Sequence, residues 1–377
     1  MGIVDFIWDY VIPFLFILTI LVFVHELGHY ALARRNGVRV ETFSIGFGPE
    51  LFGRTDRAGT RWKFSAVPLG GYVKMFGESE VVADGVDNHA LTPAEEAVSF
   101  HHKTVGQRTA IVLAGPLANF AFAIVVLAVL YAAVGNPMPL AAVGSVQPGS
   151  AADEAGLKPG DLILSIDGIE VRWFEDLRSV VSDRPGVRVA LEIDRGIGRI
   201  TVFATAKPVQ LDDEEDGRAV GRLGVAPDPN RIAYQRHNVL VAAWMGVERT
   251  VGLSGQILAY VGQIISGRRT AEELGGPLRI AQLSGEMAQG GWLNLMFFMA
   301  ALSINLGLIN LFPIPMLDGG HLVFYGVEAV RGRPLGPRTQ EYGFRFGLIL
   351  VLLLMVFATW NDLVHLKVFE FIRELVT

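Results

Sequence analysis

Four apolar runs stand out along the chain, separated by polar segments. They cover residues 11–33, 110–134, 295–310 and 346–360. Runs of about this length with few charges fit the roughly 30 Å hydrocarbon core of a bilayer, although a buried core helix is the alternative for each. The pattern therefore predicts four transmembrane helices. The third run meets Pro313 and Pro315 just after Asn310 and then continues as an apolar stretch to Arg331.

The middle of the chain has a different pattern. Short β-rich runs alternate with Gly/Pro turns through residues 141–225, which is typical of a small β-rich soluble domain. These runs are residues 142–146, 162–166, 187–193 and 200–204. Residues 235–290 show helical periodicity with glycine interruptions, which favours amphipathic helices along the membrane surface.

These patterns predict an α-helical polytopic membrane protein with an inserted β-rich domain. The expected divisions are residues 1–135, 136–230, 231–290 and 291–377. The composition agrees, since 51% of residues are hydrophobic and the mean hydropathy is +0.39. The first apolar run follows Asp5 and Asp9 without a basic residue or a cleavage site, so we expect it to be retained rather than removed as a signal peptide.

Charge and cysteine content narrow the function further. The net charge of −6 is spread without a basic tract, so we expect no nucleic-acid partner. The chain has no cysteine, which excludes disulfides, cysteine nucleophiles and thiolate metal sites. A zinc site would have to use histidine nitrogens and carboxylate oxygens.

Arginine and lysine residues around the apolar runs predict the orientation in the membrane. They cluster after the first run, before the second, and between the third and fourth. These residues are Arg34, Arg35, Arg39, Lys103, Arg108, Arg331, Arg333, Arg338 and Arg345. The two loops that carry them are expected on the cytoplasmic side, and the N-terminus and residues 135–290 on the other. The acidic run at residues 212–216 is interpreted as a solvated loop.

The first apolar run contains the motif His25-Glu26-Leu27-Gly28-His29. Histidines four residues apart lie on one face of a helix and can bind one zinc ion, with the intervening glutamate as general base. Three ionisable groups inside a membrane helix each cost roughly 2.5–3.5 kcal/mol, which favours a functional role over a hydrogen-bonded polar cluster that packs helices together.

A catalytic zinc site usually has a third protein ligand. Asp318 is the preferred candidate, because a carboxylate also neutralises the charge of the metal, and His321 is the rival on the same segment. Counting helical residues back from Arg34 and Arg331 places His25 and Asp318 at membrane depths that agree within roughly 6 Å. The remaining histidines are interpreted as surface residues: His89, His101, His102, His237 and His365.

The motifs resemble the site-2 protease family of intramembrane zinc metalloproteases, more narrowly the bacterial RseP (regulator of sigma-E protease) type. The resemblance rests on HELGH, on NLFPIPMLDG from Asn310, and on further stretches along nearly the whole chain. These stretches are GFG at 46–48, PLGGYVKM at 68–75, AGPLAN at 114–119 and SINLG at 303–307. It implies one Zn²⁺ per chain bound by His25, His29 and Asp318, with Glu26 as the base, Asn310 on the substrate or oxyanion and Asn305 assisting.

The resemblance also implies a membrane-re-entrant β-hairpin over Phe64–Met75, bent at Pro68 and Gly70-Gly71. An exposed strand edge there would capture an unwound substrate by β-addition. The expected pairing residues are Phe64, Val67, Gly70, Gly71, Tyr72, Val73 and Lys74. The alternative from the local sequence is an ordinary cytoplasmic hairpin.

The β-rich segment resembles a circularly permuted bacterial PDZ domain. The turns QPGSAA at 147–152 and AGLKPGD at 155–161, followed by a helix over residues 174–181, carry this resemblance. It implies a groove for a peptide C-terminus, formed by Arg222, Leu223, Gly224 and Val225. Whether this domain docks peptides or restricts access by size is left open.

The function expected from these features is cleavage of single-span membrane proteins, anti-sigma-factor-like or signal-peptide-like, in a bacterial inner membrane, with the PDZ domain on the periplasmic side. A non-proteolytic PDZ scaffold with a structural metal site is the alternative. The glutamate beside the two histidines argues against it, because a structural site needs no base. A zinc transporter would be expected to show further ligands within the membrane, and none stand out.

Overall fold

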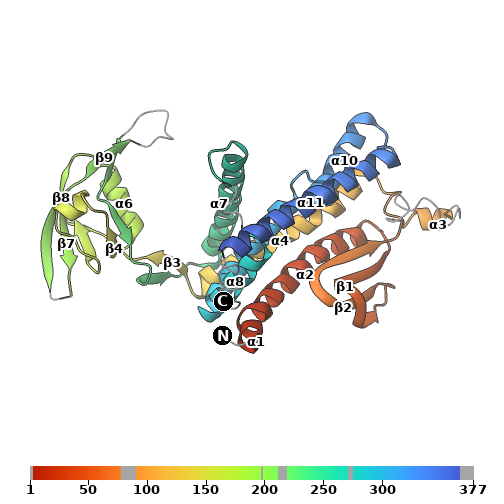
Figure 1. Cartoon of the computed structure of the whole chain (residues 1–377), viewed down its shortest axis with the longest axis horizontal. Helices are drawn as coiled ribbons and strands as arrows, with labels where there is room; N and C mark the ends of the chain where they lie inside the picture. Colours follow the sequence, from red (N-terminus) through yellow and green to blue (C-terminus); the bar gives the residue numbers. More distant parts are fainter. Residues whose placement is uncertain (1–2, 78–90, 197, 211–218, 271–274, 366–377) are drawn as a thin grey trace, which may run out of the picture. The chain divides into compact units, whose positions relative to one another are not determined.

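The computed structural model describes residues 3–77, 91–196, 198–210, 219–270 and 275–365. His89 and the acidic run at 212–216 lie outside these residues. The chain forms two compact units, one comprising Met1–Val129 with Leu240–Thr377 and the other Leu130–Val239 (Figure 1). We refer to them as the helical unit and the β-rich unit.

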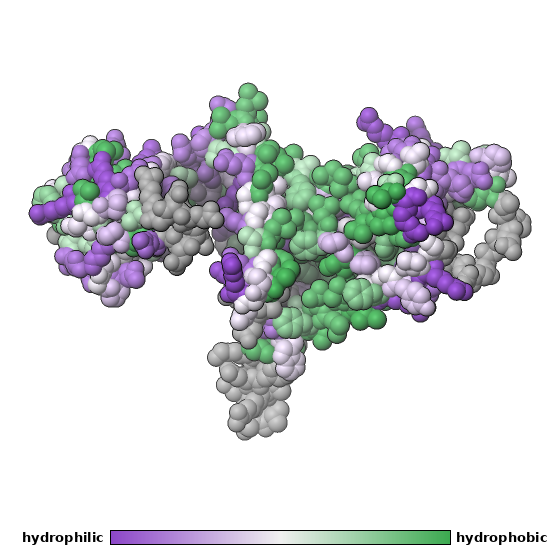
Figure 2. All heavy atoms as spheres, turned by 90° about the horizontal axis from the view of Figure 1, so that it is seen from above, coloured by the Kyte–Doolittle hydropathy of each residue, from purple (hydrophilic) through white to green (hydrophobic). Residues whose placement is uncertain are grey.

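Four helices of the helical unit are long and apolar enough to cross a membrane. The first span combines α1 (Ile3–Phe6), a π-helical turn (Ile7–Val11) and α2 (Ile12–Arg35), and the others are α4 (Val105–Ala133), α9 (Trp292–Asn310) and α11 (Pro337–His365). The prediction of four apolar helices is confirmed, although the first and fourth are several residues longer than expected. Figure 2 shows hydrophobic side chains gathered over these helices on the face drawn.

The helical unit also contains α3 (Pro93–Glu96), α7 (Val239–Ile265), α8 (Pro277–Gln289) and α10 (Asp318–Arg331). The α8 N-terminus is held by Asp362 of α11, whose carboxylate accepts hydrogen bonds from the backbone amides of Gly276, Leu278 and Arg279 at 2.8, 2.9 and 3.1 Å. A carboxylate there satisfies amides that a helix start leaves unpaired. The placement of α7 and α8 along the membrane surface remains a prediction.

A folded β-ribbon follows α2. It consists of β1 (Val40–Thr55) and β2 (Arg61–Met75), joined by a turn around Asp56. Residues 42–45 of β1 are paired on both sides, with 71–74 and with 61–64. The chain from Ser65 to Gly70 therefore passes from one side of β1 to the other.

The chain does reverse direction at the predicted bend, because residues 61–67 and 71–74 run in opposite directions beside β1. The two arms of this predicted hairpin are not paired with each other, however, since residues 42–45 of β1 lie between them. A separate, tighter turn at residues 56–60 joins β1 to β2, and there the Asp56 carboxylate accepts hydrogen bonds from the Ala58 and Thr60 amides at 2.8 and 3.0 Å. Pro68, Gly70 and Gly71 lie in the irregular segment of β2 that makes the reversal at the predicted bend and crosses β1, where the register shifts. Proline and glycine disrupt regular pairing in a strand as well as forming turns, so the sequence signal has two structural readings.

The β-rich unit contains β3 (Asn136–Pro139), β4 (Val143–Val146), α5 (Ala151–Glu154), β5 (Leu162–Ile166), β6 (Ile169–Glu170), α6 (Phe174–Ser182), β7 (Arg188–Asp194), β8 (Arg199–Thr205), β9 (Lys207–Gln210), β10 (Ala219–Arg222), β11 (Val225–Pro227) and β12 (Ile232–Gln235). One sheet has the order β6-β5-β7-β8, and β11 pairs with β4. The four predicted strands and the predicted helix are all present.

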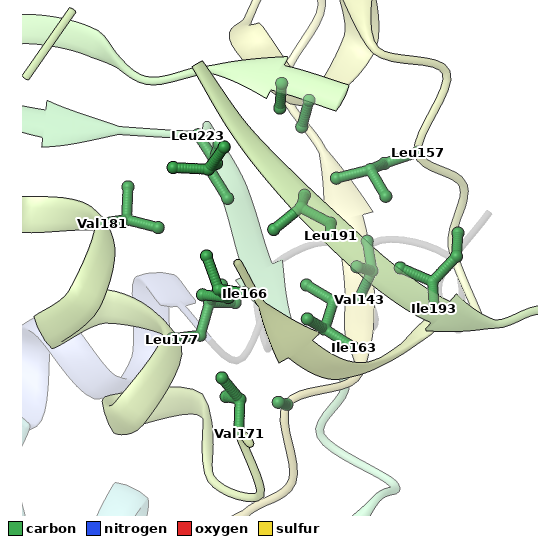
Figure 3. Close-up of a cluster of buried hydrophobic side chains, with 14 of the residues drawn as sticks. Val143, Leu157, Ile163, Ile166, Val171, Leu177, Val181, Leu191, Ile193 and Leu223 are labelled. Atoms are coloured by element: carbon green, nitrogen blue, oxygen red, sulfur yellow. The ribbon is translucent and has the colours of Figure 1, made fainter. Parts of the chain in front are cut away.

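Buried residues of β5 and β7 build the core of the β-rich unit. Ile163, Ile166, Leu191 and Ile193 are fully buried and pack toward Leu177 of α6 (Figure 3). In β7 the buried residues alternate, at Val189, Leu191 and Ile193, which is the period of two expected for a strand with one buried face. In β5 the buried residues are three apart, because the register shifts between Ile163 and Ser165. The unit thus has a hydrophobic core of its own.

An ion pair between Arg195 and Asp161 lies at the edge of this core. Arg195 donates two hydrogen bonds of 2.7 Å to the Asp161 carboxylate, which also accepts from the Lys158 amide at 2.8 Å. Burial acts to raise the pKa of Asp161, but these hydrogen bonds outweigh it and hold the pKa below its usual range. Since the folded-state pKa is depressed, this stabilisation is complete above the unfolded-state pKa of about 3.9 and is lost as pH falls through the folded-state value.

We expect Arg195→Gln to destabilise the β-rich unit by about 2 kcal/mol at pH 7 and to flatten its pH dependence below about pH 4. Hydrogen exchange of β5 and β7, followed by mass spectrometry of the full chain across pH, measures both effects. Arg199→Gln is the matched control, because Arg199 is 73% exposed and lies 3.7 Å from Glu192, a weak surface pair. Equal hydrogen-exchange protection in wild type and Arg195→Gln, at pH 7 and below about pH 4, would contradict a stabilising role for the Arg195–Asp161 ion pair.

Candidate metal centre

Two histidine side chains of α2 meet on one face of the helix. The His25 and His29 Nε2 atoms are 3.1 Å apart, and each residue is only 8% exposed. The four-residue spacing produces this approach, because positions i and i+4 stack one turn apart. Both imidazoles therefore present a nitrogen to the same point inside the helical unit.

Asp318 reaches the same point from α10. Helix α9 ends at Asn310, and the chain is non-helical through Pro313 and Pro315 before α10 begins at Asp318 itself. A side chain at position 319 would lie 2.2 Å from the Phe312 carbonyl oxygen, so glycine there lets α10 start against the unwound segment. Asp318 Oδ2 lies 3.1 Å from His25 Nε2, and Asp318 Oδ1 lies 3.5 Å from His29 Nε2.

These three side chains fit a divalent metal ion. One ligand atom from each of His25, His29 and Asp318 lies within 4.8 Å of the others. Asp318 Oδ2 is buried and makes no hydrogen bond, a costly state for a carboxylate oxygen that a metal ion would remove. Two imidazoles and a carboxylate are a donor set suited to zinc. His321, the rival candidate, lines the adjoining cavity without joining this group.

Helix α4 crosses α2 closely behind the two histidines. A side chain at position 28 would lie 2.2 Å from the Ala114 carbonyl oxygen, and one at position 115 would lie 2.3 Å from His29 Nε2. Glycines at these positions therefore allow α2 and α4 to touch. Two groups of α4 then reach the outer ring nitrogens: the Ile111 carbonyl oxygen lies 2.9 Å from His29 Nδ1, and the Asn119 amide lies 3.2 Å from His25 Nδ1.

Glu26 lies beside the histidines, toward β2. Its carboxylate accepts a hydrogen bond from the Val73 amide. Gly71 is equally close, since a side chain there would lie 3.2 Å from Glu26 Cγ. The glutamate thus joins the metal centre to one edge of the β-ribbon.

A cavity of about 1220 Å³ opens from these residues. It is lined by His25, Glu26, His29 and Asp318, and further along by Asn310, His101, His321 and Gly70–Val73. Asn305 is not among the described residues that line it, so the two predicted asparagines are not brought together there. His101, interpreted from the sequence as a surface residue, lines this cavity and is half-buried.

The other histidines give mixed outcomes. His102 is exposed, as expected, whereas His237 is half-buried. His365 ends α11, and its side chain lies outside the described residues. None of these three joins the metal group found among the described residues.

The predicted pairing residues of β2 fall into two sets. Phe64 is already paired with both Ile45 and Phe52, so its backbone is not available to a substrate, and Val67 pairs with Phe47. Gly71, Tyr72, Val73 and Lys74 pair with β1 on one side. No described strand covers the other side of 71–73, where the Val73 amide donates to Glu26. Phe64 is therefore wrong as a predicted substrate-pairing residue. The prediction of a substrate-pairing edge is narrowed to the segment from Gly70 to Lys74.

The β-rich unit has a separate groove of about 530 Å³. It lies between α6 and the segment that joins β10 to β11, and Phe174, Leu177 and Val181 form its apolar wall. The four predicted groove residues, Arg222, Leu223, Gly224 and Val225, all line it.

Comparisons with known proteins agree with this chemistry. Residues 13–354 match the model of peptidase family M50. The chain is 44% identical to a predicted zinc metalloprotease of Rhizobium meliloti over 94% of this chain and 96% of that protein. It is 42% identical to one of Agrobacterium fabrum, over 96% and 98%. It is also 38% identical to the metalloprotease MmpA of Caulobacter vibrioides, over 97% and 98%.

Among solved structures, the PDZ domain of an SdrC-like protein from Listeria monocytogenes aligns with 24% of this chain and 87% of that domain, at 19% identity and a TM-score of 0.20. A likeness of that size does not assign the fold of the β-rich unit.

Proposed function

The chain belongs to peptidase family M50 and is a zinc metalloprotease, and from this premise we propose that it cleaves single-span membrane proteins within the bilayer. The observation that carries the proposal is the position of His25, Glu26 and His29 in a helix long enough to span a membrane. Asp318 meets them from an unwound segment, and unwound backbone at membrane depth is tolerated where it lines a cavity. The substrate class we infer is anti-sigma-factor-like or signal-peptide-like.

We assign the roles within the site as follows. His25, His29 and Asp318 hold one Zn²⁺ per chain. Zinc in such a site supplies Lewis-acid polarisation and lowers the pKa of water toward neutrality. Glu26, at the cavity wall, takes the proton of the attacking water and passes it to the nitrogen of the departing amine. Asn310, which lines the same cavity, would donate its amide to the substrate carbonyl oxygen.

The edge of β2 explains how a helical substrate becomes accessible. The amides of a helix are locked in internal hydrogen bonds, so a protease must unwind the segment it cuts. A substrate strand added to residues 71–73 would replace those bonds and would lie next to Glu26. We propose this segment as the substrate-binding edge.

Strand addition predicts a cross-linking pattern with a period of two. The chain has no cysteine, so Lys74→Cys creates a single thiol, and Lys74 is exposed. We expect disulfides with single cysteines placed at alternate positions of an unwound substrate segment, because side chains on one face of a sheet recur every second residue. A period of three to four would instead indicate a bound helix, and Arg39→Cys, on an exposed residue before β1, is the control thiol.

We further propose that the protein resides in a bacterial inner membrane, in contact with the lipid bilayer through its four apolar helices. The distribution of arginine and lysine supports cytoplasmic loops at residues 34–108 and 331–345 and a periplasmic β-rich unit. The groove at Arg222–Val225 has the volume and apolar wall to take a peptide C-terminus. On this basis the β-rich unit is a PDZ domain that meets the extracytoplasmic part of a substrate.

The test of the proposed function uses purified protein and a single-span substrate reconstituted together in lipid vesicles. Cleavage is expected to stop when a zinc chelator is added and to return when Zn²⁺ is restored. Cleavage that continues at the same rate in chelator, after zinc has been shown to leave the protein, would overturn it.

A further inference from the structure

The two histidines of α2 are held differently at their outer ring nitrogens. His29 Nδ1 lies 2.9 Å from the backbone carbonyl oxygen of Ile111. His25 Nδ1 lies 3.2 Å from the side-chain nitrogen of Asn119. Asn119 is fully buried, and its amide oxygen has no hydrogen-bond partner. The side chain of Asn119 is thus an incompletely satisfied group in direct contact with an imidazole of the metal centre.

The chemistry of imidazole dictates which end of the amide His25 needs. A neutral histidine that binds a metal through Nε2 carries its proton on Nδ1 and must donate it. The Ile111 carbonyl satisfies this requirement for His29. At His25, the amide nitrogen of Asn119 cannot accept a proton, whereas the amide oxygen can. Rotation of the amide by 180° exchanges the two atoms with little change in shape.

We propose that Asn119 is a positioning residue for the metal centre: in the zinc-loaded protein its side-chain oxygen accepts the Nδ1 proton of His25. This hydrogen bond selects the tautomer with a free Nε2 lone pair and fixes the plane of the ring. The inference rests on the proposed zinc site at His25, His29 and Asp318.

The surroundings of Asn119 hold it at this position. Its backbone carbonyl oxygen accepts a 2.8 Å hydrogen bond from the Ser303 hydroxyl of α9. Gly307 of the same helix packs closely, since a side chain there would lie 3.3 Å from Asn119 Cβ and 3.0 Å from the Pro116 carbonyl oxygen. Because α4 is fixed by α9 in this way, a smaller side chain at position 119 would leave His25 Nδ1 without its partner.

The readout is the Kd for Zn²⁺, measured by competition with a chromophoric chelator on the full-length protein in detergent. Loss of an outer hydrogen-bond partner of a metal-binding histidine typically costs about 10–100-fold in metal affinity. We expect Asn119→Ala to raise the Kd by about this factor. Asn119→Asp, which offers only acceptor oxygens, should restore affinity to within a few-fold of wild type. With Co²⁺ in place of zinc, the visible absorption of Asn119→Ala should also shift.

Ser303→Ala is the structural control, because it loosens the same helix junction without touching the imidazole, and its Kd should stay near that of wild type. An unchanged Kd in Asn119→Ala overturns the proposal. If Asn119→Ala and Asn119→Asp weaken zinc binding equally, Asn119 does not act as the hydrogen-bond acceptor of His25 and contributes only through packing. His25→Ala separates this inference from the site itself: if that variant binds zinc as tightly as wild type, the proposed site fails rather than the role of Asn119.

Discussion

Glu26→Gln is expected to lower the rate of proteolysis by about 10²–10⁴-fold and to leave zinc near one equivalent per chain. The glutamine keeps the size of the side chain and can still accept from the Val73 amide. It cannot take a proton from water, so the chemical step fails while His25, His29 and Asp318 are untouched. Initial rates on a reconstituted single-span substrate, together with metal analysis of the same sample, measure both quantities.

A second carboxylate of the same cavity provides the control for this prediction. Glu328 lines the cavity and accepts a 2.6 Å hydrogen bond from Arg108. Glu328→Gln removes one negative charge and can still accept from Arg108, so we expect cleavage within several-fold of wild type. Wild-type rates from Glu26→Gln would exclude Glu26 as the base, and equal losses in both variants would indicate a general effect of cavity charge.

Asp318→Ala is expected to remove zinc and activity together, whereas His321→Ala keeps most of its metal. The aspartate places one oxygen 3.1 Å from His25 Nε2 and the other 3.5 Å from His29 Nε2. Loss of Asp318 should raise the Kd for zinc by more than the roughly 10–100-fold that is typical when a metal-binding histidine loses its hydrogen-bond partner. Chelator competition on the two alanine variants gives the comparison directly.

The reverse pattern, with zinc retained by Asp318→Ala and lost from His321→Ala, would reassign the third ligand. His321 is a demanding comparison because it lies only three residues along α10 and lines the same cavity. Its ring packs 5.2 Å from that of Phe344, between centroids, so His321→Leu tests whether any loss in the alanine variant comes from packing.

Local sequence signals were sufficient where one element carries the chemistry. The spacing of His25 and His29 fixes their approach within a single helix, and four apolar runs long enough for a bilayer become four long helices. The approach of Asp318 required a second argument, the matching of depths in the membrane. The structure brings the two side chains together, with 3.1 Å between Asp318 Oδ2 and His25 Nε2.

Signals with two physical meanings were harder to interpret. Pro68 and the glycines after it predicted the bend of a hairpin, and the chain does reverse there, but residues 42–45 of β1 lie between the two arms. Phe64 appeared to be an available strand residue, yet its backbone is paired on both sides. Whether a strand residue is already paired depends on partners that are distant along the chain. The alternation of side chains in the sequence does not identify those partners.

Asn119 and the Val73 amide were outside the reach of sequence reasoning. An asparagine in an apolar run can pack helices together or bind a ligand group, and only the crossing of α2 and α4 shows that it contacts His25. A hydrogen bond from a backbone amide cannot be predicted from the side-chain pattern, because every residue except proline has such an amide. His101 is a similar case, since only the tertiary structure places it in the cavity wall.

The position of the cut in a substrate tests the central claim most directly. A single-span protein is reconstituted with the purified protease in lipid vesicles, and both fragments are identified by mass spectrometry. The structure predicts a cut inside the apolar span, absent with Glu26→Gln and in the presence of a zinc chelator. A cut confined to the soluble flanks of the span, or the same fragments from Glu26→Gln, would contradict intramembrane cleavage at this metal centre.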